Sequence, residues 1–84
     1  WPLPLWDEYE ADIKGTFGDW ANVGKIDRAG GAITGAMFLY QFIKDHSWLH
    51  IDMAPTMTAI EGEHLAKGAA GSPVRLLIKL LEVL

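Results

Sequence analysis

The last eleven residues of the chain, 74–84, constrain its fold more than any other segment. Only Arg75, Lys79 and Glu82 are polar in this stretch, and they recur at i, i+4 and i+7. That spacing predicts a helix with one narrow solvated stripe, and the apolar remainder of such a helix requires burial. Ser72 and Pro73 suit the N-cap and the first turn of this helix. The chain therefore needs an apolar partner surface for its last helix.

Residues 48–53, which read WLHIDM, carry a similar requirement. Two side-chain sets alternate along them, Leu49, Ile51 and Met53 on one face and Trp48, His50 and Asp52 on the other. This period of two predicts a β-strand. A single strand leaves backbone N–H and C=O groups without partners. Either two copies of the chain pair with each other, or the neighbouring strands lie in sequence that is absent here.

Two further helices are predicted upstream. Tyr9, Ile13 and Phe17 recur at i, i+4 and i+8, and Asp7 precedes them as a candidate N-cap. A second helix is predicted over residues 32–45, whose first half is small and apolar almost all round. Residues 19–31 and 54–71 are predicted to be loops, because their glycines and turn residues follow no sustained period. The order helix, helix, strand, helix is typical of the end of an α/β layered domain.

Length and composition predict a piece of a larger protein. Eighty-four residues form one small domain at most, yet 50% of them are hydrophobic and four are Trp. A free domain of this size buries only about 60–65% of its chain surface, too little to hide that much apolar material. The chain also begins at Trp1 rather than Met. We expect a C-terminal segment of a bigger protein, or a processed or engineered piece.

Charge and cysteine content argue against several function classes. Seven basic and eleven acidic residues give a net charge of -4, which disfavours nucleic acid and anionic membranes as main partners. The absence of cysteine excludes a disulfide scaffold and a cysteine zinc site. Lys79 and Glu82 interrupt the longest apolar run, which stays below the ~20 residues of a membrane helix. No basic start leads into an apolar stretch, so no signal peptide is predicted.

Two groups of candidate metal ligands occur in the sequence. His50 and Asp52 share one face of the predicted strand, about 7 Å apart at Cα, and Glu61, Glu63 and His64 cluster in the following loop. A metal bridging both groups is one interpretation. The favoured interpretation is a hydrogen-bonded core histidine and a solvated acidic cluster, because the spacing matches no tight ligand motif.

Nucleophilic catalysis and phosphate binding have weaker support. Ser47 and Ser72 are the only serines, and neither lies in a nucleophile-elbow pattern. Residues 67–73 resemble a phosphate-binding loop loosely, but they lack its terminal Lys-Ser/Thr pair. The many aromatic side chains fall mostly at apolar helix or strand positions, which favours packing over a ligand platform.

Four sequence blocks occur in an order and spacing that resemble one family. They are DWANVG at 19–24, RAGGAITGAMFLYQF at 28–42, WLHIDMA at 48–54 and KGAAGSPVRLLIKLL at 67–81. Together they cover essentially the whole chain. The chain resembles the C-terminal end of the leucyl aminopeptidases, the cytosolic M17 metallopeptidases.

The resemblance implies that the chain is part of a two-metal exopeptidase. Such enzymes remove N-terminal residues, often leucine, from peptide substrates with two divalent ions, Mn or Zn among them. It implies an α/β fold in which residues 1–84 form the C-terminal helix-helix-strand-helix part of an α/β/α sandwich catalytic domain, incomplete on its own. It also implies a homo-hexamer in the cytoplasm.

The catalytic machinery is expected to lie outside this chain. The family's metal ligands and its catalytic Lys and Arg lie upstream, and they include an Asn-Thr-Asp-Ala-Glu-Gly-Arg string that residues 1–84 lack. By this resemblance we expect no metal ligand and no catalytic residue in the chain. We therefore expect the chain alone to be inactive.

The resemblance assigns pocket residues instead. The segment after the His-x-Asp strand borders the pocket for the substrate's first side chain in this family, which places Ala54 and Met57 there. A small residue and a thioether suit an apolar side chain of Leu or Met size. The loop around Asn22, Val23 and Gly31 is expected to flank the next subsite.

Two positions depart from the family pattern. Pro55 stands where the family has Gly, and a proline removes a donor and stiffens the pocket rim. Ser72 stands where the family has Arg, so an arginine contact is lost. The departure at Pro55 predicts a specificity that differs from the family's usual one.

Three hypotheses follow from the sequence. The chain is a fragment of an M17-type aminopeptidase, or a non-catalytic oligomerisation or binding module derived from that family. Alternatively it is a free-standing metal-binding miniprotein that uses His50, Asp52 and the Glu61–His64 cluster. The coding sequence upstream of Trp1 separates the first two hypotheses, and the metal content of the isolated chain tests the third.

Overall fold

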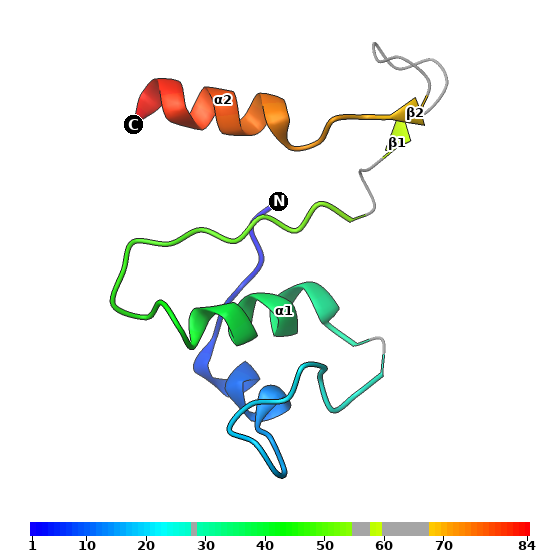
Figure 1. Ribbon diagram of the computed structural model, residues 1–84, viewed down its shortest axis with the longest axis vertical. Coiled ribbons are helices and arrows are strands. Elements are labelled where there is room, and N and C mark those ends of the chain that lie inside the picture. The colour runs from blue at the N-terminus through cyan, green and yellow to red at the C-terminus, as the bar shows by residue number, and fades with distance from the viewer. Residues whose placement is uncertain (28, 55–57, 60–67) are drawn as a thin grey trace. The chain divides into compact units, whose positions relative to one another are not determined.

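The computed structural model describes residues 1–27, 29–54, 58–59 and 68–84. The elements follow in the order η1 (Asp7–Ile13), α1 (Gly31–Tyr40), β1 (Thr58–Ala59), β2 (Gly68–Ala69) and α2 (Val74–Val83), as Figure 1 shows. The element η1 is a 3-10 helix. The chain divides into two compact units, Trp1–His50 and Ile51–Leu84.

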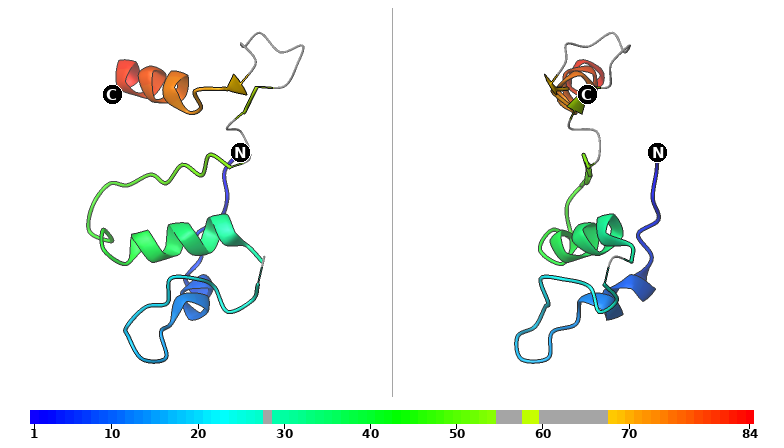
Figure 2. Two further views of the ribbon diagram at one scale, coloured as in Figure 1. Left: turned by 45° about the vertical axis from the view of Figure 1, so that its right-hand side comes forward. Right: turned by 90° about the vertical axis from the view of Figure 1, so that its right-hand side faces the viewer.

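The core of the first unit forms where η1 packs against α1 (Figure 2). Ile13 at the end of η1 and Met37 in α1 are each 1% exposed, and Ala36 is also buried. The hydroxyl of Thr34, a buried polar residue, donates to the carbonyl of Gly31 at 3.1 Å. These three apolar side chains are the buried hydrophobic residues of the described part of the chain, so the core is small.

The first helix is shorter than the sequence predicts. It ends at Ile13, and Phe17 is 106% exposed in the turn that follows. The prediction that Phe17 continues an apolar helical stripe is wrong, because the chain turns back after η1 rather than extending it. Asp7 is the first residue of η1 and not its cap, since the N-cap is Trp6 and no side chain caps the helix.

The second helix begins close to its predicted start and ends earlier. Residues 41–45 form turns rather than helix. The N–H groups of Gln41 and Phe42 donate to the carbonyls three residues before them, at 3.3 and 3.1 Å. Such i to i+3 bonds tighten the end of a helix. Gly30 precedes the helix with a φ of 59°, which glycine adopts without a steric cost.

The strand predicted over residues 48–53 is not formed in the described part of the chain. These residues carry no ladder hydrogen bonds there. The ring of Trp48 instead lies between Tyr40 and His50, with centroid distances of 5.6 and 6.0 Å. The alternating pattern needs a neighbouring backbone before it becomes a strand.

The second unit contains a short strand pair inside the predicted loop of residues 54–71. β1 and β2 are antiparallel, with Thr58 opposite Ala69 and Ala59 opposite Gly68. The prediction of a loop without strands is therefore wrong at these positions. Three of these four residues are glycine or alanine, which are depleted in strands, so local propensity does not predict the pair.

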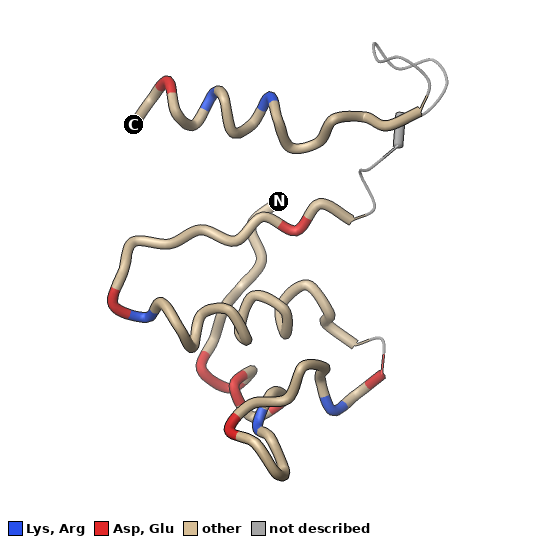
Figure 3. The backbone as a smooth tube through the Cα atoms, viewed as in Figure 1, with Lys and Arg blue, Asp and Glu red and all other residues tan. Residues whose placement is uncertain are grey.

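α2 confirms the predicted last helix but leaves it uncovered. No residue of α2 is buried, and Leu81 and Val83 are 72% and 71% exposed. Lys79 donates to Glu82 at 2.8 Å, and these charges mark the polar stripe that Figure 3 shows along the helix. The N-cap position belongs to Pro73 rather than Ser72, and no side chain caps the helix. None of the described helices is long and apolar enough to cross a membrane.

The exposure of α2 leads to a prediction for the isolated 84-residue chain. We expect the chain to self-associate or to be poorly ordered, because exposed apolar surface of this kind drives association. Sedimentation velocity should show species larger than a monomer, and Leu81→Glu should reduce their share. The polar-stripe variant Lys79→Gln is the matched control. A monomer with strongly protected amides in residues 48–53 would contradict this expectation.

Candidate functional site

Ala54, predicted to wall the first-side-chain pocket, lies in the second unit at the end of an extended segment. The residue is exposed, and its N–H donates to Oδ1 of Asp52 at 3.1 Å. A side-chain acceptor two residues before the donor forms an Asx turn. Asp52 therefore fixes the backbone that carries the Ala54 methyl group.

Met57, the second predicted wall residue, lies outside the described residues, as does Pro55. Their placement at the pocket remains a prediction.

The loop residues predicted at the next subsite lie in the first unit. Asn22 and Val23 are exposed in a bend, and Val23 is 77% exposed. A Cβ placed on the neighbouring Gly24 would lie 3.2 Å from Cγ2 of Thr34, so this loop runs against the first turn of α1. Gly31 is the first residue of α1. The structure thus brings the loop and Gly31 to the same end of one helix.

The candidate metal ligands are engaged in other contacts where they are described. The His50 ring packs near Trp48, and Asp52 accepts the N–H of Ala54. Residues 61–64 lie outside the described part of the chain. Among the residues that the structure describes, no three or more His, Asp or Glu side chains gather in a way that holds a metal ion. No step of a reaction is assigned to a metal held by these residues.

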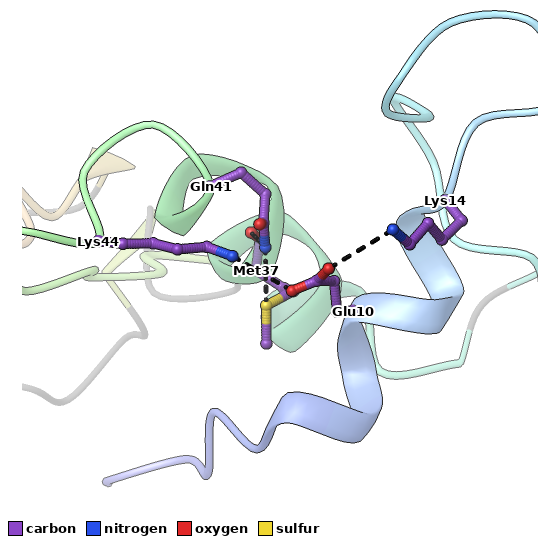
Figure 4. A network of polar contacts seen from close by, with 5 residues as sticks. All are labelled: Glu10, Lys14, Met37, Gln41 and Lys44. Atoms are coloured by element: carbon purple, nitrogen blue, oxygen red, sulfur yellow. Dashed lines mark hydrogen bonds and ion pairs between the residues drawn. The ribbon is translucent and has the colours of Figure 1, made fainter.

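A charged contact that the sequence pattern does not predict lies between η1 and the segment after α1 (Figure 4). Glu10 lies between two lysines, with Oε1 3.7 Å from Lys14 Nζ and Oε2 3.3 Å from Lys44 Nζ. Lys14 also lies 5.0 Å from the ring centroid of Trp20, and Lys44 lies 5.8 Å from that of Tyr40. The spacing of Glu10 and Lys14 signals their pair in a helix. Nothing in the sequence indicates that Lys44 contacts Glu10.

Figure 4 also shows the end of α1, which lies beside the contact of Glu10 with Lys44. Gln41 Nε2 donates to the carbonyl and to Sδ of Met37, at 3.1 and 3.2 Å. The ion pairs are partly exposed, and each contributes about 0.2–1 kcal/mol. The cluster joins η1 to the turns that follow α1.

Comparison with known proteins covers nearly the whole chain. Residues 1–78 match the cytosol aminopeptidase family, catalytic domain. The chain is similar to the probable cytosol aminopeptidases of Azoarcus sp. strain BH72 (49% identical over 81 residues) and Methylobacillus flagellatus (46% over 82). It is also 47% identical over 81 residues to the cytosol aminopeptidase of Vibrio cholerae. These alignments include 96–98% of this chain but only 15–16% of each relative.

Proposed function

The chain belongs to the cytosol aminopeptidase family, and we propose that it is part of a two-metal-dependent leucyl aminopeptidase, which removes N-terminal residues from peptides. The match of residues 1–78 to the catalytic domain carries this proposal. Because the chain spans 15–16% of the length of these relatives, the activity is proposed for a longer parent protein.

Within the parent enzyme, this segment contributes pocket wall and core packing. Ala54 and Met57 border the pocket for the substrate's first side chain, and the loop of Asn22 and Val23 with Gly31 flanks the next subsite. The exposed methyl of Ala54 on a hydrogen-bonded turn supports the first assignment. The contact of the loop with the start of α1 supports the second. The segment orients the substrate and keeps water from its apolar side chain.

The two divalent ions, Mn or Zn, are assigned to residues of the parent outside this chain. The chemistry that such ions supply is activation of a water and binding of the substrate's amine and carbonyl oxygen. From the family resemblance, the parent is proposed to be a homo-hexamer. A place in the cytoplasm is proposed as well, in keeping with the names of the relatives, which are cytosol aminopeptidases.

Hydrolysis of leucyl-p-nitroanilide tests the proposal. The purified parent should hydrolyse it, lose the activity on chelation and regain it with Mn²⁺ or Zn²⁺. The isolated 84-residue chain, assayed with the same ions, should show no turnover because the ligands are missing. A parent that stays inactive with every divalent ion would overturn the aminopeptidase proposal. Saturable, metal-dependent turnover by the pure isolated chain would overturn the division of roles.

The uncovered apolar surface of α2 favours a second candidate function. The chain would then be a non-catalytic oligomerisation or binding module derived from the family. The coding sequence upstream of Trp1 discriminates the two, because an enzyme needs the Asn-Thr-Asp-Ala-Glu-Gly-Arg string. A parent that lacks this string, binds no divalent ion and still assembles would support the module.

A further inference from the structure

We propose that Asp52 is a positioning residue that sets the preference of the parent enzyme for the substrate's first side chain, by holding the backbone of Ala54. This inference rests on the proposed function, in which Ala54 walls the pocket. It assigns Asp52 a role in specificity and none in the chemical step.

The contact that carries the inference is the hydrogen bond from the Ala54 N–H to Asp52 Oδ1, at 3.1 Å. Residues 48–53 belong to no strand ladder in the described part of the chain. The Asp52 carboxylate accepts the backbone N–H of Ala54, the residue that directly follows the predicted strand. This bond holds the direction in which the Cβ of Ala54 leaves the backbone.

The length of the Asp52 side chain decides whether the turn closes. Asp and Asn place an oxygen at the distance from which it accepts the N–H two residues later. Glu carries the same charge, but one more methylene moves its oxygen away from this position. The proline at position 55 also restricts Ala54, since the residue before a proline is biased towards extended conformations. The Asp52 bond and the proline thus constrain Ala54 from its two sides.

The methyl of Ala54 is small, so the width of the pocket depends on where its Cβ lies. Without the Asx turn this position becomes variable, and the pocket no longer holds a leucyl side chain in one place. An alanyl side chain reaches less far into the pocket and therefore loses less contact with its wall. Loss of the turn should therefore affect leucyl substrates more than alanyl ones.

The experiment compares three variants of Asp52, one of Asp45 and Ala54→Leu, all in the metal-loaded parent enzyme, on leucyl and alanyl p-nitroanilides. Asp52→Ala and Asp52→Glu should lower the leucyl-to-alanyl ratio of kcat/KM by about three- to ten-fold, the effect of losing one hydrogen bond. The change should appear in KM for the leucyl substrate rather than in kcat. Asp52→Asn keeps the acceptor and should retain the ratio. Asp45→Ala removes an exposed carboxylate from the turn after α1 and is the matched control.

Each outcome separates this inference from the proposed function. A ratio kept in Asp52→Glu but lost in Asp52→Asn would show that charge, not the turn, matters, and would overturn the inference. Equal losses of kcat on both substrates with KM unchanged would indicate damage to folding and would also overturn it. If Asp52→Ala fails to fold, the comparison of Asp52→Glu with Asp52→Asn still tests the inference. If Ala54→Leu leaves the ratio unchanged, the pocket assignment itself fails, whatever the Asp52 variants do.

Discussion

Replacing Ala54 with Leu in the parent enzyme is expected to lower the preference for leucyl over alanyl substrates by about tenfold or more. The added side chain fills space that the substrate's first side chain needs, and a leucyl group needs more of it than an alanyl group. Met57→Ala should shift the same ratio by a similar factor, because it enlarges the pocket and removes apolar contact.

The readout is kcat/KM on both substrates, with metal analysis of the same samples. Bound metal should stay constant in both variants, since neither side chain is a proposed ligand. Ala11→Leu is the matched control, because Ala11 is exposed on η1 and is not among the predicted pocket residues. An unchanged ratio in both pocket variants would show that these residues lie elsewhere. Loss of metal would place the segment closer to the catalytic centre.

Gly15→Ala is expected to open the turn after η1. A Cβ at this position would overlap the carbonyl oxygen of Gly18 and lie 3.1 Å from the backbone N of Trp20. The turn is closed by hydrogen bonds from Gly15 N–H to Asp19 at 3.1 Å and from Ala21 N–H to Ile13 at 2.7 Å. Overpacking of this kind costs about 1–3 kcal/mol, or about 5- to 150-fold in a local opening equilibrium.

Amide hydrogen exchange in the parent protein measures this effect at the Gly15 and Ala21 N–H groups. Gly18→Ala is the matched control, because a Cβ on Gly18 meets no atom within 4 Å. Gly18→Ala should leave the exchange of both groups close to that of the wild type. Equal exchange rates in the two variants would mean that the turn has a different geometry in the parent.

The last helix and the start of the second helix were predictable because their signals are local. The polar stripe of Arg75, Lys79 and Glu82 fixes the period of α2, and the structure adds the bond between Lys79 and Glu82. The small apolar run after Gly30 likewise predicts α1. Family membership was also predictable, since four sequence blocks in order are specific without any knowledge of contacts.

The prediction for residues 48–53 failed because a strand depends on a neighbouring backbone, and the prediction for Phe17 failed because a turn ends the helix before this residue. The alternation in WLHIDM is a property of the sequence, but a strand also needs a second backbone to pair with. The i, i+4, i+8 pattern of Tyr9, Ile13 and Phe17 predicts a helix, but Gly15 permits a turn that ends it.

The sequence by itself determined the family, the apolar stripe pattern of α2 and the residue types available to the pocket. Tertiary structure decided which distant groups meet, as when Glu10 pairs with Lys44 across 34 positions. The side-chain patterns of helices and strands recur every two to four residues, so they can be recognised from the sequence alone. Contacts between groups far apart in the sequence, such as Glu10 and Lys44, depend on the folded path of the backbone.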